Sequence, residues 1–488
     1  MAHVPSFLTP HQWQQHVYVG GWRPSHQKLE IVEPATGKRL ATTGLASVED
    51  VAQAAALAQR AQQDWAAQHP RDRAAVLHRA AALLQQHHDE LSLWVARETG
   101  GVLPKGQHEV RESVAFCLQS AAMPTQSQGQ VLPSVPGRLS LARRMPHGVI
   151  SVISPFNFPL ILSLRVVAAA LATGNAVLVK PDPRTPISGG HLLAQLFEAA
   201  GLPPGLLSVL PGGADVGEAL VTAPEVSMVS FTGSVGVGRR VGELAARHLK
   251  KVSLELGGTN SLVILDDADL DLAASNAAWG AWQHQGQICM ASNRVLVHES
   301  IAPALLERLV AKANHMTVGD GATGPVSMGP LIDARQRDRV HHIVQEAVQS
   351  GAQLLAGGTY EGLFYCPTVL TGTRLGMRVH DEEVFGPVLS LNTFRSDEEA
   401  AALANAHRGG LSAGVITRSL NRGLALAQHL RAGMVHVNDQ TVNDDVVNPF
   451  GGPGVAGNGS VHGGPADWEA FTVWRWLTVK DAPPAYPV

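Results

Sequence analysis

The sequence contains very little cysteine: Cys117, Cys289 and Cys366 are the only three in 488 residues. They lie far apart and are odd in number, so they predict neither a disulfide framework nor the paired spacing of a zinc site. Free thiols of this kind favour a reducing compartment. We therefore expect a cytoplasmic protein.

Long hydrophobic runs are also missing. The most apolar region, residues 149–179, is interrupted by prolines, a glycine and asparagines, whereas a membrane-spanning helix needs about 20 consecutive apolar residues. The first 20 residues lack the charged start and the apolar stretch of a secretory signal. We expect neither a membrane span nor secretion.

Blocks of basic charge are absent as well. Lys and Arg number 37 against 41 Asp and Glu, which gives a net charge of −4, so the chain lacks the electrostatic footprint of a nucleic-acid binder. The 22 histidines show no ligand-like clustering. The acidic run at residues 266–271 lacks the glycine and the terminal glutamate of a calcium loop, and it is typical of a helix start. We expect no metal site.

The sequence does have core material for two large domains. Its apolar share is 45%, and 488 residues exceed what one hydrophobic core usually serves. From residue 148 short apolar strands alternate with helices, which predicts right-handed βαβ units and a parallel sheet with ligands at the carboxyl ends of its strands. After Gly257-Gly258 the alternation begins again, which predicts a second α/β domain. The strands expected in the first domain are at 149–154, 176–180, 206–210, 226–231 and 252–256.

The flanking segments have a different pattern. Residues 17–44 predict short antiparallel strands, and four helices follow from a capping-box-like start at Ser47 up to residue 122. Prolines and glycines in 123–147 indicate a hairpin that stands off the body, either as a partner surface or as a plain surface loop. Residues 410–416 and 433–437 look like buried strands, and 474–479 is an extended run that should pair with another strand edge.

Two residues are candidates for covalent and acid–base chemistry. Cys289 follows a Gly-Gln turn, where a thiol could act as a nucleophile if a helix dipole, a base or a cation activates it. An inert buried thiol is the alternative. Glu255 ends an apolar strand, so burial should raise its pKa and suit it to general-base catalysis. A structural glutamate that caps a turn is the alternative.

Two strand ends are candidates for binding a nucleotide. Residues 231–238, Phe-Thr-Gly-Ser-Val-Gly-Val-Gly, follow a strand and open a helix, whose N-terminus favours the charge of a pyrophosphate. An ordinary strand–helix turn is equally consistent with this stretch. Lys180 ends another parallel strand, where it could bind a ribose or a phosphate. A solvated surface lysine is the interpretation that this stretch alone would favour.

Taken together, seven stretches resemble the aldehyde dehydrogenase superfamily, in the family's order and over essentially the whole chain. Those at 180–185, 284–290 and 438–444 resemble, more narrowly, bacterial benzaldehyde and vanillin dehydrogenases. The seven stretches are Pro155-Phe156-Asn157-Phe158-Pro159, Lys180-Pro181, Phe231-Thr232-Gly233-Ser234, Leu254-Glu255-Leu256-Gly257-Gly258, Gly286-Gln287-Ile288-Cys289, Glu383-Val384-Phe385-Gly386-Pro387 and Pro449-Phe450-Gly451-Gly452.

The resemblance implies a reaction. Cys289 would attack the aldehyde carbon, while the side-chain amide of Asn157 and the backbone N–H of Cys289 hold the oxyanion. Hydride transfer to a nicotinamide would leave a thioester on Cys289, and Glu255 would activate the water that releases a carboxylic acid. An aromatic, benzaldehyde-like substrate is expected. The alternatives are a semialdehyde or aliphatic aldehyde dehydrogenase, a CoA-acylating enzyme, which the presence of Glu255 disfavours, and a non-catalytic binding protein on the same fold.

The resemblance also implies cofactor and substrate contacts. NAD is the expected cofactor, with NADP also used. Phe158 and Leu162 are expected to line the substrate pocket. The charged Arg165 either faces the pocket beside them or points away. The implied cofactor contacts are Lys180 with the adenine ribose, Gly233 and Ser234 with the pyrophosphate, Glu383 with the nicotinamide ribose, Phe385 with the nicotinamide, and Ser154, Pro155 and Phe156 beside the cofactor.

The implied architecture is α/β, with a Rossmann-type parallel-sheet cofactor domain, an α/β catalytic domain and a small β hairpin for oligomerisation. The expected ranges are 1–122 and 146–256 for NAD(P) binding, 257–448 for catalysis, and 123–145 with 467–488 for assembly into a homodimer or homotetramer. Three residues depart from the family pattern. Phe156 replaces the usual tryptophan, Thr259 replaces an asparagine or lysine, and Pro183 replaces a glutamate of NAD-preferring members, which leaves a 2′-phosphate less repelled.

Overall fold

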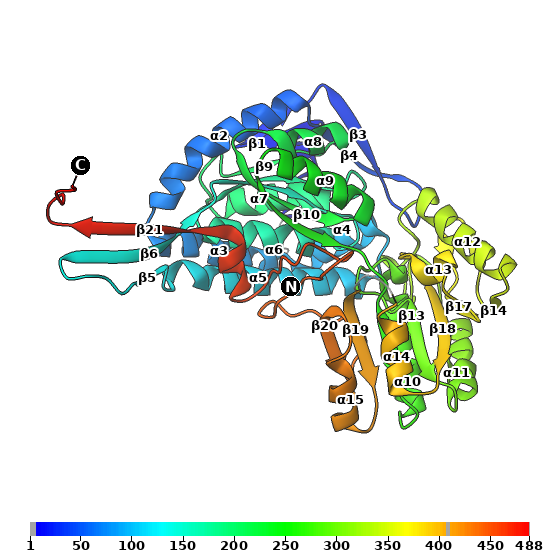
Figure 1. The fold of residues 1–488 in the computed structure, drawn as a ribbon. Coiled ribbons are helices and arrows are strands. Elements are labelled where there is room, and N and C mark those ends of the chain that lie inside the picture. The colour runs from blue at the N-terminus through cyan, green and yellow to red at the C-terminus, as the bar shows by residue number, and fades with distance from the viewer. Residues whose placement is uncertain (1–5, 407–409, 488) are drawn as a thin grey trace.

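The computed structural model describes residues 6–406 and 410–487. Two α/β lobes lie side by side, and a narrow three-stranded arm projects from the first lobe (Figure 1). No helix in these residues is both long and apolar enough to cross a membrane.

The first lobe is built on a seven-stranded sheet of order β11-β10-β7-β8-β9-β1-β2. The five strands from β11 to β9 run parallel, as predicted, and β1 adds to them antiparallel. β8 is buried along its whole length, which is why its sequence is a continuous apolar run before the lysine. The strands are β1 (His16–Val19), β2 (Trp22–Pro24), β7 (Val149–Ile153), β8 (Ala176–Lys180), β9 (Leu207–Val209), β10 (Val226–Gly233) and β11 (Lys251–Leu256).

Helices cover this sheet and complete its core. The predicted capping box at Ser47 is confirmed: its side chain accepts from the Asp50 N–H, and the Asp50 carboxylate accepts from the Ser47 N–H. The helical segment before α7 begins as a π-helical turn, Ile187–His191. The helices are α1 (Pro10–Trp13), α2 (Val48–Ala67), α3 (Pro70–Gln86), α4 (His88–Thr99), α5 (Leu103–Ala122), α6 (Pro159–Ala172), α7 (Leu192–Ala199), α8 (Ala214–Thr222) and α9 (Val235–Arg247). A separate antiparallel pair joins β3 (Gln27–Val32) and β4 (Arg39–Leu45).

The second lobe has its own seven-stranded sheet, of order β14-β17-β18-β13-β12-β19-β20. All pairs are parallel except β14 with β17. The prediction that β20 is buried was wrong: it is the edge strand, so only β19 covers it on one side and its residues stay partly exposed. The strands are β12 (Ser261–Ile264), β13 (Arg294–His298), β14 (Gln353–Ala356), β17 (Thr368–Thr371), β18 (Val388–Phe394), β19 (Gly410–Ile416) and β20 (Ala432–Val437).

The helices of the second lobe alternate with these strands, as the sequence predicted. α10 begins at Asp269, whose carboxylate accepts from the N–H groups of Asp271 and Leu272, so the acidic run is a helix start. The helices are α10 (Leu270–Trp282), α11 (Ala302–His315), α12 (Ala334–Gln349), α13 (Arg378–Asp381), α14 (Asp397–Ala404) and α15 (Leu420–Ala427). A two-stranded hairpin, β15 (Tyr360–Glu361) with β16 (Phe364–Tyr365), lies outside the main sheet.

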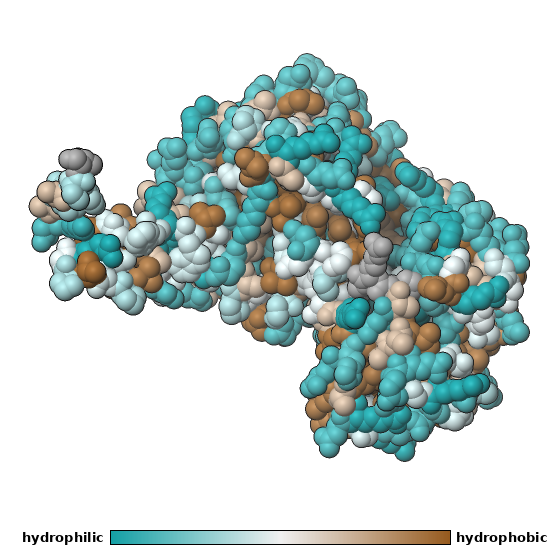
Figure 2. Space-filling view, in the orientation of Figure 1, coloured by the Kyte–Doolittle hydropathy of each residue, from teal (hydrophilic) through white to brown (hydrophobic). Residues whose placement is uncertain are grey.

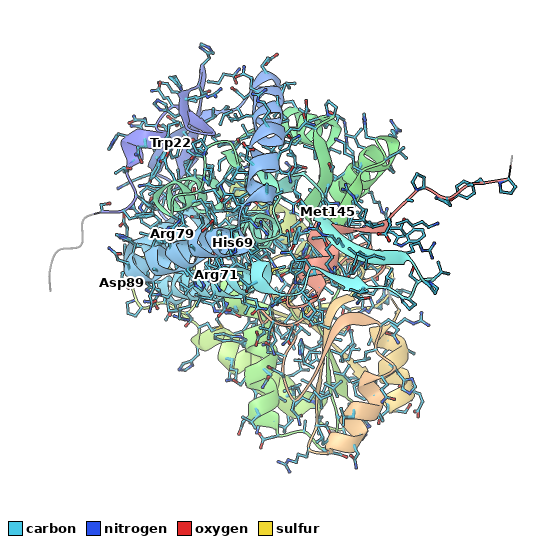
Figure 3. All side chains as sticks on the ribbon, turned by 90° about the vertical axis from the view of Figure 1, so that its left-hand side faces the viewer. Trp22, His69, Arg71, Arg79, Asp89 and Met145 are labelled. Atoms are coloured by element: carbon cyan, nitrogen blue, oxygen red, sulfur yellow. The ribbon has the colours of Figure 1, made fainter. Side chains whose placement is uncertain are left out.

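The arm consists of β5 (Gly129–Val131), β6 (Arg138–Pro146) and β21 (Thr472–Lys480), all antiparallel. The extended run at 474–479 therefore pairs with β6. Helix α16 (Ala466–Phe471) precedes β21 and buries Phe471 in the core of the first lobe. Apolar side chains, Trp474 and Trp476 among them, are exposed along the arm. Figure 2 shows scattered hydrophobic residues on the arm among pale and hydrophilic ones. Figure 3 views the molecule from this side, with Met145 on β6.

Candidate active site

The predicted site residues lie on two sets of loops. In the first lobe, Lys180, Gly233 and Glu255 lie at the carboxyl ends of β8, β10 and β11, the edge where a parallel sheet binds ligands. In the second lobe, Cys289 and Glu383 lie in loops before β13 and β18. The two sets meet: the Glu383 carboxylate packs directly against the Cα of Gly257, where any Cβ would collide with it.

The loop that carries Cys289 has an unusual backbone. His284, Gln285 and Gly286 have φ of 45°, 57° and 64°, the left-handed region that side chains disfavour. Gly286 cannot be replaced without strain, because a Cβ there would collide with the carbonyl oxygen of Gly386. Such a conformation persists only where its surroundings hold it.

Asn260 holds this loop from the position just before strand β12. Its Nδ2 donates to the carbonyl oxygens of Cys289 (2.7 Å) and Ala291 (3.1 Å), and its Oδ1 accepts from the Ser412 N–H at 3.0 Å. The hydroxyl of Thr441 donates to the carbonyl of Met290. Sequence reasoning missed Asn260. The available signal was a polar side chain between the Gly257-Gly258 turn and a fully buried strand.

Cys289 itself is partly exposed. Burial raises the pKa of its thiol, and the nearby carboxylates of Glu383 and Glu255 raise it further, while Arg165 opposes them. The thiol is therefore protonated at neutral pH in this structure. A base must take its proton when it attacks a substrate.

Asn157 is buried beside the Cys289 loop, with only 2% of its surface exposed. Its Nδ2 donates to the carbonyl oxygen of Gln287 at 2.9 Å, and an amide nitrogen has a second N–H to offer. The start of α6 after it is fixed by Glu109, whose carboxylate accepts from the N–H groups of Leu160 (3.0 Å) and Ile161 (3.2 Å). Sequence reasoning missed Glu109, because 48 residues separate it from Asn157.

Glu255 has the environment that the sequence predicted. It is buried, and neither carboxylate oxygen has a hydrogen-bond partner within the described part of the chain. Burial raises the pKa of this carboxyl well above its usual 4.5, and the positive charge of Arg165 opposes the rise. A carboxyl group of this kind binds a proton more strongly than an exposed one, which suits a general base.

The family model of aldehyde dehydrogenases matches residues 22–477 of this chain. The chain belongs to the aldehyde dehydrogenase family. It is 51% identical to a vanillin dehydrogenase of Amycolatopsis over 99% of this chain and 100% of that one. It is 46% identical to a benzaldehyde dehydrogenase [NAD(+)] of Pseudomonas putida over 97% and 98% of the two chains. A betaine aldehyde dehydrogenase of Staphylococcus aureus, solved in complex with NAD+, superimposes with a TM-score of 0.94 at 29% identity over 97% and 96%.

The cofactor side of this aldehyde dehydrogenase begins at Lys180. The side chain is only 8% exposed, so it is not the solvated lysine that its own stretch favoured. Burial lowers the pKa of its ammonium group, while Asp182 and Asp215 oppose the fall. Within the described residues its ammonium group makes one hydrogen bond, 3.5 Å long, to the Pro181 carbonyl, so it has donors left for a ligand.

The turn from β10 into α9 fits a phosphate group. Ser234 is the N-cap residue of α9, yet its side chain makes no capping bond, so the first N–H groups of the helix face outward. Gly233 lies directly against the ring of Phe231, which leaves no space for a Cβ. Ser154, another expected cofactor residue, lies directly after β7 and is 5% exposed. Its hydroxyl oxygen accepts a hydrogen bond from the Ser163 hydroxyl at 2.7 Å.

Two aromatic rings bridge the lobes beside this turn. Phe156, after Pro155 in the loop before α6, meets Phe385 edge-on with ring centroids 5.7 Å apart. The Arg184 guanidinium lies 4.0 Å from the centre of the Phe156 ring and binds both Asp182 (2.8 Å) and Asp333 (2.9 Å). Arg184 is thus engaged by two carboxylates, and Pro183 beside it places no carboxylate of its own.

Glu383 gives a test of the electrostatics through stability. Burial raises the pKa of its carboxyl to about 8, against 4.5 for an unperturbed glutamate. The folded state therefore favours the protonated carboxyl of Glu383. Its contribution to the free energy of unfolding is fully present below the pKa of an unfolded glutamate, and it is lost as the pH rises through the pKa in the folded state. We expect the thermal midpoint of cofactor-free wild type to fall relative to that of Glu383→Gln as the pH rises toward about 8.

The measurement is a melting curve at each pH for both proteins, with Glu382→Gln as the matched control. Glu382 is the exposed neighbour and pairs with Arg378 at the surface. If the difference between the thermal midpoints of wild type and Glu383→Gln stays constant across this pH range, the raised pKa of Glu383 is contradicted.

The residues expected to line the substrate pocket lie at the start of α6. Phe158 is partly buried, with the Lys105 ammonium 4.7 Å and the His284 ring 5.3 Å from its ring, and Leu162 is 8% exposed one turn later. Of the two orientations left open for Arg165, the structure shows a buried side chain that does not point away to solvent. Its guanidinium donates to the Asp444 carboxylate at 3.2 Å, and its charge acts on the pKa of both Glu255 and Cys289.

Proposed function

We propose that this aldehyde dehydrogenase oxidises an aromatic, benzaldehyde-like aldehyde to the carboxylic acid with NAD(P). The observation that carries the proposal is the meeting of Cys289, Asn157 and Glu255 in one desolvated site between two α/β lobes. The relatives named for vanillin and benzaldehyde support the aromatic substrate. Phe158 and Leu162 line the pocket that would receive the ring.

In the first half of the proposed reaction, Cys289 forms a bond to the aldehyde carbon. The thiol proton passes to the ionised form of Glu255, the carboxylate whose charge acts on this thiol. The aldehyde oxygen becomes an oxyanion, which accepts hydrogen bonds from the second N–H of Asn157 and from the backbone N–H of Cys289. Bound NAD would accept a hydride from this thiohemiacetal. The loss of the hydride leaves a thioester on Cys289.

In the second half, water cleaves the thioester. Glu255 takes a proton from the water, a C–O bond forms, the C–S bond breaks, and the carboxylic acid leaves with the Cys289 thiol restored. The raised pKa of Glu255 makes its carboxylate a stronger base than an exposed glutamate. Both halves use the same two side chains, so Glu255 must release its first proton to solvent between them.

The cofactor contacts are part of the proposal. Lys180 would bind the adenine ribose, Gly233 and Ser234 the pyrophosphate, and Glu383 the nicotinamide ribose. Phe385 would pack near the nicotinamide, with Ser154, Pro155 and Phe156 lining the cleft. The unpartnered Oε1 of Glu383 and the uncapped start of α9 fit such a ligand. We expect NAD to be used and NADP to be accepted, since Pro183 offers a 2′-phosphate no repulsion.

The assembly and location are proposed in the same way. Residues 1–122 and 146–256 would form the cofactor domain, 257–448 the catalytic domain, and 123–145 with 467–488 the elements that join subunits into a homodimer or homotetramer. The exposed tryptophans of the arm support this role. The three free cysteines support a reducing, cytoplasmic location.

Asn157→Ala should lower kcat by about 100- to 1,000-fold, the usual cost of one lost oxyanion donor. The physical reason is that the barrier rises for forming the thiohemiacetal, while KM and melting temperature change little. Steady-state rates check this, with Asn276→Ala as the control, because Asn276 donates its bond on the exposed face of α10. A wild-type kcat in Asn157→Ala would show that the side-chain amide does not stabilise the oxyanion.

The proposal as a whole is tested by initial rates of cofactor reduction with benzaldehyde, vanillin and succinic semialdehyde, each with NAD and with NADP. An aromatic aldehyde should give the highest kcat/KM. A higher value with succinic semialdehyde would favour the semialdehyde alternative on the same fold. Cofactor binding without oxidation of any aldehyde would favour a binding protein.

A further inference from the structure

Arg165 on α6 is a buried cation with unused hydrogen-bond donors. Its side chain is 4% exposed and donates through Nη1 to the Asp444 carboxylate at 3.2 Å. Its Nε and Nη2 are buried without any partner within the described residues. A buried donor without a partner is costly, so its retention calls for an explanation.

The guanidinium is held in a fixed orientation. The rings of Phe116 and Phe450 lie 5.1 Å and 4.5 Å from its carbon, and Asp444 fixes the remaining edge. A planar group between two rings cannot turn to find other acceptors. Its free donors are therefore presented to one place.

That place lies close to Cys289, because Phe450, whose ring packs on the guanidinium, belongs to the hydrophobic cluster against which Cys289 packs. Among charged groups, Arg165 has the largest effect on the pKa of Glu255, which it lowers, and Asp444 acts on both Glu255 and Cys289. Leu162, which lines the proposed pocket, lies three residues earlier on the same face of α6. The pair thus faces the space that receives the aldehyde.

We propose that Arg165 and Asp444 form a subsite for a hydroxyl group on the aromatic ring of the substrate. The phenolic oxygen accepts from Nε or Nη2 of Arg165, and its O–H donates to the Asp444 carboxylate. This inference rests on the proposed function and specifies its substrate class. A hydroxyl group can both accept and donate, so it satisfies both members of the pair at once.

Charge disfavours a carboxylate in the same subsite. Asp444 already neutralises Arg165, and Glu255 lies within range of both. A further negative charge would face two carboxylates against one guanidinium. The subsite therefore selects a hydroxylated aromatic aldehyde over a carboxylated one.

The test compares kcat/KM for 3-hydroxy- and 4-hydroxybenzaldehyde with that for benzaldehyde and 4-carboxybenzaldehyde in each enzyme. Wild type should favour at least one hydroxybenzaldehyde over benzaldehyde by about 10- to 100-fold, the range of a hydrogen bond to a charged group. Arg165→Met should bring this ratio close to one. Arg308→Met removes an Arg–Asp pair from the surface of α11 and should leave the ratio at the wild-type value.

The ratio of kcat/KM for hydroxybenzaldehyde to that for benzaldehyde distinguishes the subsite from a structural role, in which Arg165 only ties the loop of Asp444 to α6. In the structural role Arg165→Met lowers both rates together and leaves the ratio unchanged, and that result would overturn the proposal. If Arg165→Met does not fold, Arg165→Lys and Asp444→Asn replace it. Each loses part of the two-sided hydrogen bonding and should lower the ratio, and an unchanged ratio in both overturns the subsite.

The two proposals fail in different ways. Turnover of benzaldehyde with a ratio near one in wild type, or a preference for 4-carboxybenzaldehyde over both hydroxybenzaldehydes, overturns the subsite and leaves the aromatic aldehyde dehydrogenase intact. Turnover of succinic semialdehyde without turnover of any aromatic aldehyde overturns the proposed function itself.

Discussion

Cys289→Ala should abolish aldehyde oxidation, with a fall in kcat of about 10,000-fold or more. Without the thiol no covalent bond forms to the aldehyde carbon, and the hydride donor of the reaction never arises. Cofactor binding should persist, because Lys180 and the α9 turn lie on the other lobe. Rates of cofactor reduction and binding of NAD by fluorescence measure the two properties separately.

Cys366→Ala is the matched control for this result. Cys366 is also a partly exposed free cysteine, but it lies beside Thr359 at the hairpin of β15 and β16. Its replacement should leave the rate unchanged. The assignment of Cys289 as the nucleophile would be wrong if Cys289→Ala kept more than a few per cent of the wild-type rate. It would also be wrong if Cys366→Ala lost that rate.

Glu255→Gln should separate the two halves of the reaction. The first turnover should still release reduced cofactor equal to about one equivalent of enzyme, but more slowly than in wild type, because the amide cannot take the thiol proton. The steady rate that follows should be about 100- to 10,000-fold slower than in wild type. The amide cannot take a proton from water, so the thioester on Cys289 accumulates. Rapid-mixing absorbance gives both the burst and the steady rate.

Glu243→Gln, at an exposed position on α9, controls for the loss of a negative charge. It should show wild-type kinetics. The burst also distinguishes the two proposed uses of Glu255: if the carboxylate is needed to take the thiol proton, the burst itself becomes slow. Wild-type turnover in Glu255→Gln would show that another group activates the water.

Much of the fold follows from local sequence. β8 begins and ends at the predicted residues, because buried parallel strands are short apolar runs between clear breakers. The alternation of strands and helices then fixes a parallel sheet and its ligand edge. The motifs around Asn157, Glu255 and Cys289 predicted residues that the structure indeed brings together.

The rest of the site depends on contacts between distant segments. Asn260 clamps the Cys289 loop, and Glu109 fixes the helix after Asn157, yet no local pattern marks either residue. The sequence leaves the orientation of Arg165 open, because a lone charge on an apolar helix is costly to bury. Asp444, 279 residues later, supplies the counter-charge inside the protein, and no local pattern shows that pairing.

The most direct test of the account is to locate the covalent intermediate. Glu255→Gln is mixed with benzaldehyde and NAD, quenched in acid and digested, and its peptides are weighed by mass spectrometry. The account predicts a benzoyl group on the peptide that contains Cys289, and none when Cys289 is also replaced by alanine. Reduced cofactor without an acyl group on Cys289, or an acyl group on Cys366, would contradict the mechanism.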